Sequence, residues 1–138
     1  MPAASTPSTT TQIFVFKRLR ELLGLLVFQF IIGMALNTIG KPDSTTSHSV
    51  KVLWDSLLGI HIVVAFALLI GGSYLSIYCG RHYKKLSTPS TQAIVAVTLA
   101  FIFGSMTISG VVPSLMSYLM ALSFLAALLL YVQTFRKL

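Results

Sequence analysis

His61 is the one side chain well inside an apolar stretch of this sequence that can titrate near neutral pH. Ionisable residues are costly in hydrocarbon, so a histidine in such a stretch is a candidate for function. Counted from the outer end of its stretch, His61 lies about 6 Å inside the apolar layer. Asn37 is expected at a similar depth on the preceding helix, where it could accept or donate a hydrogen bond to a neutral imidazole. Gln29 completes the predicted structural polar cluster of Gln29, Asn37 and His61.

Haem ligation is the sharper interpretation of His61, because a helical histidine can hold haem iron. In this respect the chain resembles haem-b membrane proteins of the cytochrome b561 type. Those proteins supply paired ligands, whereas the other two histidines here lie at different depths. A second ligand would have to be Met106, Met116 or Met120, or His61 of another subunit. Contact with a quinone near the outer surface is a related redox alternative.

Methionines give a second candidate chemistry, because thioethers together with an imidazole suit Cu(I). Met116 and Met120 are one helical turn apart, and Met34 and Met106 map to the same half of the membrane. The Met-x-x-x-Met spacing of Met116 and Met120 resembles that in copper-uptake channels, although the rest of the chain does not resemble those channels. Methionine is also an ordinary filler of apolar cores, so core packing is the competing interpretation.

Composition identifies the environment that must hold these residues. The chain has 138 residues, of which 55% are hydrophobic and 9% charged, against about 25% charged in ordinary soluble domains. The mean hydropathy of +0.85 indicates that much apolar surface faces lipid. Cys79 is the single cysteine, so it forms no intrachain disulfide.

Four apolar runs are each long enough to cross a membrane as a helix, at about 22–39, 57–77, 93–110 and 114–135. They lack the alternation of barrel strands, so we predict an all-α polytopic protein, an up-down bundle of four transmembrane helices. Gly40 and Gly80 are expected to end the first two spans, and Pro89 to precede the third. The short connection before Pro113 predicts an antiparallel hairpin with Pro113 in the first turn of the last helix.

Two segments are predicted: a disordered Ser/Thr/Pro-rich cytoplasmic tail over 1–16 and a membrane domain over 17–138. A full-length apolar run without a cleavage site favours an uncleaved first helix over a signal peptide. Basic residues are concentrated on one side of the predicted topology. They are Lys17, Arg18, Arg20, Arg81, Lys84, Lys85, Arg136 and Lys137. The other side has two lysines balanced by two aspartates, so both termini are predicted to be cytoplasmic in a cell membrane. This placement at span ends argues against nucleic acid as the partner of the net charge of +7.

Small and polar residues should mark the helix faces that meet inside the bundle. The predicted inward residues are Gln29, Gly33 and Asn37; His61, Ala65, Leu68, Gly72, Ser76 and Cys79; Ala93, Ala96, Ala100, Gly104 and Thr107; and Ser117, Ala121, Phe124 and Tyr131. The predicted lipid-facing residues are Val63, Phe66, Ile70, Val95 and Ile102.

A resemblance rests on Gln29-x-x-x-Gly33-Met34-x-x-Asn37 in the first span, His61 in the second, Gly104 in the third and Ser114-Leu115-Met116 with Tyr131 in the fourth. These motifs resemble small four-span bacterial integral membrane proteins to which no activity is assigned. The resemblance implies a four-helix topology, and the outer loop here is shorter than in those proteins.

The sequence favours a non-enzymatic role as a structural or accessory membrane subunit that packs as a homo-oligomer or in a larger membrane complex. The alternatives are electron transfer through haem b or a quinone at His61, and a small transporter or Cu(I)-handling protein that uses His61, Met106, Met116 and Met120. No carboxylate or central proline lies within a span, which argues against proton-coupled transport.

Overall fold

Four α-helices make up the part of the chain that the computed structural model describes, residues 9–110 and 113–138. They are α1 (Thr9–Ile39), α2 (His48–His82), α3 (Lys84–Ile108) and α4 (Pro113–Arg136), with no strand among the described residues. All four are long and apolar enough to cross a membrane. The prediction of an all-helical protein with four long apolar helices is confirmed.

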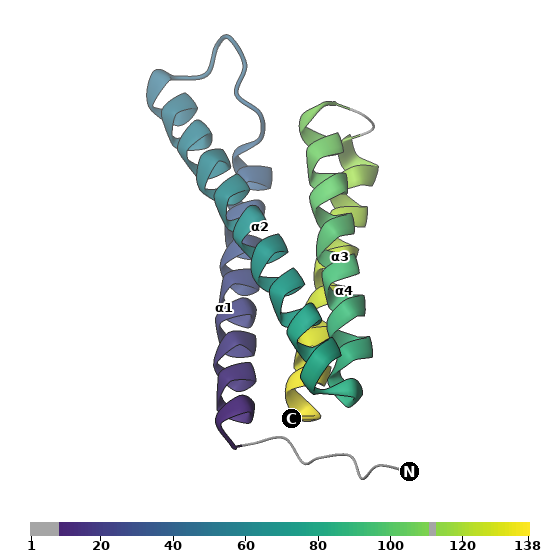
Figure 1. Cartoon of the computed structure of the whole chain (residues 1–138). Coiled ribbons are helices and arrows are strands. Elements are labelled where there is room, and N and C mark those ends of the chain that lie inside the picture. Colours follow the sequence, from purple (N-terminus) through teal and green to yellow (C-terminus); the bar gives the residue numbers. More distant parts are fainter. Residues whose placement is uncertain (1–8, 111–112) are drawn as a thin grey trace.

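The helices form a ring in which α1 packs against α2, α2 against α3, α3 against α4, and α4 against α1. The two hairpins, α1–α2 and α3–α4, lie close together near the C-terminus and diverge toward the ends that carry the α1–α2 and α3–α4 connections (Figure 1). The α3–α4 contact is the most extensive and the α1–α4 contact the smallest. The bundle is therefore tight at one end and splayed at the other.

Helix α1 begins earlier than the sequence predicted. Residues 9–16, which were assigned to a disordered tail, are helical, and residues 1–8 lie outside the described part. Val15 and Leu19, which are one helical turn apart, are both fully buried in the core, and this burial explains the longer helix. Burial of these side chains extends the helix to the N-terminal side of residue 17, where the predicted membrane domain begins.

The junction of α2 and α3 also differs from the prediction. Helix α2 continues past Gly80 to His82, α3 begins at Lys84, and only Tyr83 separates them. Pro89 lies inside α3 and is buried, instead of preceding the helix. Position 89 lies in the second turn, where the missing N–H removes a single main-chain hydrogen bond.

The other two connections follow the predicted chemistry. Gly40 follows α1 with a φ of 70°, and its N–H donates to the Leu36 carbonyl at 3.0 Å. Gly110 follows α3 with a φ of 84°, and Pro113 is the first residue of α4. A positive φ is easy for glycine and strained for other residues, which explains the helix ends at both positions.

Eight of the 18 predicted inward residues are buried, eight are partly buried and two are exposed. Gln29, Leu68, Gly72, Cys79, Ala93, Ala96, Ala100 and Tyr131 are buried. The predicted lipid-facing residues Val63, Phe66, Ile70, Val95 and Ile102 are all exposed. Asn37 and Ala121 are exposed, contrary to the predicted inward faces. At 100° per residue, Asn37 lies about 80° around the helix from Gln29, and Ala121 lies about 80° from Tyr131.

Candidate functional site

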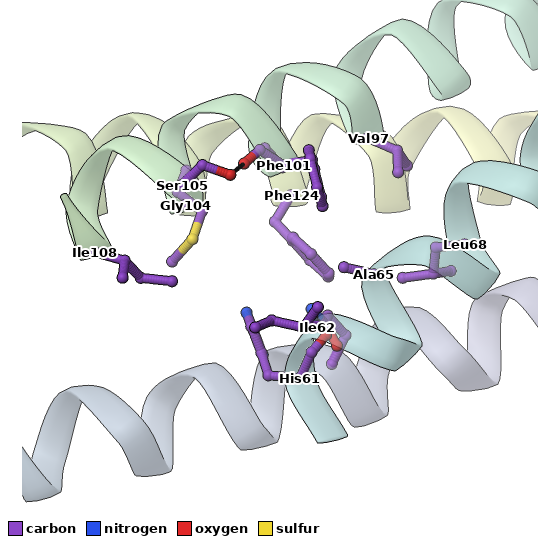
Figure 2. Close-up of a pocket in the computed structure, with 13 residues that line it drawn as sticks. His61, Ile62, Ala65, Leu68, Val97, Phe101, Gly104, Ser105, Ile108 and Phe124 are labelled. Atoms are coloured by element: carbon purple, nitrogen blue, oxygen red, sulfur yellow. Dashed lines mark hydrogen bonds between the residues drawn. The ribbon is translucent and has the colours of Figure 1, made fainter. Parts of the chain in front are cut away.

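A small cavity lies between the two hairpins, in the half where they diverge, and all four helices contribute to its wall. Its volume is about 60 Å³. Figure 2 shows His61 and Ala65 of α2 facing Phe101 and Gly104 of α3 across this space, with Phe124 reaching in from α4. Gln29 is the residue that α1 adds to the lining. Most of the wall is apolar, so Gln29 and His61 supply its main polar groups.

Gln29 and His61 are joined by a hydrogen bond between α1 and α2. The Gln29 Nε2 amide donates to the main-chain carbonyl of His61 at 3.0 Å. Gln29 is only 2% exposed, although it carries a polar side chain. A buried amide held in this way fixes the register of the two helices. The structure thus brings together two members of the predicted polar cluster.

Each of these two residues also has a buried polar atom without a hydrogen-bond partner among the described residues. These atoms are Gln29 Oε1 and His61 Nδ1. Leaving a buried donor or acceptor unpaired costs about 1–3 kcal/mol, and the surrounding apolar wall offers no replacement. The two unmade hydrogen bonds distinguish this cavity from an ordinary packing defect.

Gly33 allows the imidazole of His61 to lie close to α1, because glycine has no side chain at this position. An added Cβ at Gly33 would lie 3.2 Å from His61 Cε1 and 3.9 Å from His61 Nδ1. An edge of the His61 ring therefore lies against α1, one turn beyond Gln29. The sequence indicated Gly33 only as one of the small residues on the inward face, and it did not predict the contact of Gly33 with the imidazole.

Asn37 does not join the pair. Its side chain is exposed, it does not line the cavity, and no hydrogen bond links it to His61. The hydrogen bond that the sequence suggested between Asn37 and His61 is replaced by the contact from Gln29. The rotation of about 80° between positions 29 and 37 accounts for this difference.

One of the three methionines considered for a metal site shares the cavity with His61. Met120 lines it, and its Sδ lies 3.2 Å from where a Cβ on Gly104 would be. Met106 and Met116 are partly buried and do not line the cavity. Within residues 9–110 and 113–138, no group of three or more His, Cys, Asp or Glu side chains is placed to hold a metal.

Haem does not fit the cavity in this arrangement of the helices. A volume of about 60 Å³ holds a few water molecules, which is far less than a porphyrin requires. His48 is exposed at the start of α2, and His82 packs on the Tyr78 ring at the opposite end, with centroids 4.6 Å apart. Neither histidine can pair with His61 across one haem, so ligation would require the hairpins to separate or a second subunit to contribute.

Two further buried hydroxyl groups lie outside the cavity, one on a residue predicted to face inward and one on a residue that was not. Ser90 and Tyr131 are fully buried, and their hydroxyl oxygens have no partner in the described part of the chain. Tyr131 reaches from α4 to Gly72 on α2, and Ser90 lies on the face of α3 that packs inward. Gly72, within the stripe predicted to face inward on α2, could have indicated that a large side chain fills the space opposite it. Nothing in the sequence singled out Ser90.

No protein family model, curated protein or solved structure significantly matches this chain.

Proposed function

We propose that the chain is a multi-pass protein of the cell membrane that acts as a non-enzymatic accessory subunit, associating with a second copy of itself or with a larger membrane complex. The observation that carries this proposal is the incomplete contact between the two hairpins. Helices α1 and α4 make the smallest contact in the ring, and both present rows of exposed apolar side chains. Helices in lipid associate by close packing, so such faces accommodate further helices.

Charge distribution supports an orientation with both termini in the cytoplasm. The start of α1, the α2–α3 junction and the end of α4 lie at the same end of the bundle (Figure 1). That end carries the eight basic residues that flank the helices. At the other end, Lys41 and Lys51 are accompanied by Asp43 and Asp55. An excess of lysine and arginine is typical of cytoplasmic segments.

The accessory role is tested by extracting the tagged protein from membranes with its surrounding lipid and measuring the mass of the intact particle. We expect a defined assembly heavier than the 15.0 kDa chain. A protein that is monomeric at every concentration, with no companion chain in stoichiometric amount, contradicts the proposal.

Cu(I) handling is the second candidate, and it is supported by the presence of both Met120 and His61 in the lining of the cavity. Membrane preparations loaded with Cu(I) under reducing conditions should retain less copper after Met120→Leu or His61→Ala. Met34→Leu is the matched control, because Met34 is 51% exposed and lies outside the cavity. Equal retention in all four proteins excludes this candidate.

A further inference from the structure

We propose that the cavity between the hairpins binds the hydroxyl head of a membrane-soluble molecule, whose apolar tail lies between α2 and α3. This inference goes beyond an accessory role and does not depend on it. It stands on three features of the cavity: the hydrogen-bonding capacity left free on Gln29 and His61, the direction in which the cavity opens, and its size.

The free atom on Gln29 determines the chemistry of the head. Its Nε2 already donates to the His61 carbonyl at 3.0 Å, and Oε1 is buried without a partner. An amide oxygen only accepts hydrogen bonds, so the missing partner must carry an O–H or N–H group. A ketone, an ether or an oxidised quinone has no such donor. A phenol, a quinol or a long-chain alcohol has one.

The free nitrogen on His61 is compatible with the same head. A neutral imidazole has one donor nitrogen and one acceptor nitrogen, and Nδ1 has no partner. A hydroxyl group both donates and accepts, so it can engage Nδ1 in either tautomer. The ring edge that carries Cε1 and Nδ1 lies beside Gly33 of α1, where an added Cβ would be 3.2 Å from Cε1 and 3.9 Å from Nδ1.

The cavity opens toward the lipid-facing surface between α2 and α3. Ile62, Ser105 and Ile108 line it and are also exposed. The Ser105 hydroxyl already donates to the Phe101 carbonyl at 2.9 Å, so this rim offers no unused donor. A molecule that enters here arrives from the bilayer and passes apolar side chains first.

Aromatic pairs border the cavity on two sides. Phe66 and Phe101 meet between α2 and α3 with ring centroids 5.2 Å apart. Phe30 and Phe124 meet between α1 and α4 with centroids 6.5 Å apart. Phe101 and Phe124 also line the cavity (Figure 2). These rings leave the α2–α3 side toward Ile108 as the route for an apolar tail.

The small volume of the cavity limits which part of the ligand it can enclose. About 60 Å³ accommodates a few water-sized groups, whereas sites that enclose a whole small molecule measure about 300–1,000 Å³. Only the polar head can be enclosed, and the rest of the molecule must lie along the diverging helices. This arrangement suits an amphiphile of the bilayer and does not suit a water-soluble metabolite.

The test compares 4-octylphenol with its methyl ether, 4-octylanisole, which has the same tail and lacks the O–H donor. The protein is placed in lipid nanodiscs, and binding is measured after subtracting partition into empty nanodiscs of the same lipid. The phenol should bind about tenfold more tightly than the ether, the effect of one hydrogen bond made in an apolar site. The Gln29→Leu variant should lose this preference, and Gln133→Leu, at an exposed glutamine on α4, should keep it.

Gln29→Leu also removes the hydrogen bond to the His61 carbonyl, so a second variant that keeps this bond is needed. Ala65→Leu fills the cavity without removing a polar group, and it should abolish binding of the phenol while the protein stays helical and monodisperse. Equal affinity for phenol and ether, a preference that survives in Gln29→Leu, or binding unaffected by Ala65→Leu overturns the proposal. Absence of binding to either probe also overturns it and leaves the cavity as a site for water only.

Discussion

The phenol oxygen of Tyr131 on α4 lies directly over Gly72 on α2, where an added Cβ would be only 2.5 Å away. Ile94 of α3 closes the same space, with its Cδ1 at 2.8 Å from that position. Both Tyr131 and Gly72 are buried. Three helices thus meet at a point that only a residue without a side chain can occupy.

Gly72→Ala should therefore destabilise the bundle. Overpacking of a well-filled core costs about 1–3 kcal/mol, which exceeds the gain of about 0.5–1 kcal/mol expected from replacing glycine by alanine in a helix. Reversible unfolding in mixed micelles measures the change. Gly59→Ala is the control, because nothing lies within 4 Å of a Cβ at that position, and it should be neutral or slightly stabilising.

Tyr131→Phe should restore part of the stability that Gly72→Ala removes. The substitution deletes the nearest obstructing atom, and that atom is also a buried hydroxyl without a hydrogen-bond partner in the described residues. By itself it should be neutral or stabilising by about 1 kcal/mol. If the two changes are strictly additive in the double variant, the two residues are not in contact.

Gly33→Ala should displace the His61 ring, because the new methyl group would lie 3.2 Å from Cε1. The neighbour must move by a few tenths of an ångström, and the aromatic ¹H and ¹³C signals of His61 should shift accordingly. Gly24→Ala on the same helix has nothing within 4 Å and should leave those signals in place. Identical spectra for the two variants would mean that His61 does not pack on α1.

Asp43 should titrate below the ordinary carboxyl range in the loop between α1 and α2. Its Oδ1 accepts hydrogen bonds from the main-chain N–H and hydroxyl groups of Thr45 and Thr46, at 2.7–2.9 Å. The two side-chain hydrogen bonds are the main cause that lowers its pKa from 3.8. Because the pKa of Asp43 is lower in the folded loop than in the unfolded chain, the ionised carboxylate stabilises the folded loop. This contribution is complete at pH values above the unfolded pKa and is lost as the pH falls through the folded pKa.

A carboxyl ¹³C titration of Asp43 measures this effect. Replacing both threonines by valine should raise the midpoint toward 3.8, because the two hydroxyl donors are removed while the main chain is kept. A midpoint that does not respond to the double substitution would show that the hydroxyl groups do not hold the carboxylate.

Cysteines at positions 44 and 84 should be labelled from opposite sides of the membrane. Ser44 and Lys84 are exposed at opposite ends of the bundle, and Cys79→Ser removes the buried native thiol. With a reagent that does not cross the membrane, Ser44→Cys should react in intact cells and Lys84→Cys only after the cells are opened. Reaction of both from outside would overturn the proposed orientation.

The number of helices and most of their inward faces could be predicted from the sequence, because they follow from the length of apolar runs and the placement of small residues. Ala93, Ala96 and Ala100 show this well, since one alanine face on α3 permits close packing. Helix ends were harder to predict. Hydropathy does not register a helix that continues into polar residues, as α2 does at His48 and α3 at Lys84.

The candidate site was predicted only in part. Gln29 and His61 stood out as polar residues in apolar runs, whereas the choice of Asn37 assumed that residues four apart stay on one face. Two such steps turn the helix by about 80°, which moved Asn37 outward. The cavity itself could not be predicted, because it depends on the angle at which two separate hairpins diverge.

Because a single residue joins α2 to α3, a small change of the angle between these helices moves residues far from the junction by a large distance. His61 lies 22 residues before Tyr83, a lever of about 33 Å at 1.5 Å per residue, so a tilt of about 5° at the junction moves it by about 3 Å. Such a displacement is as large as a water molecule. The separation of the far ends of α2 and α3 therefore determines the width of the space beside His61.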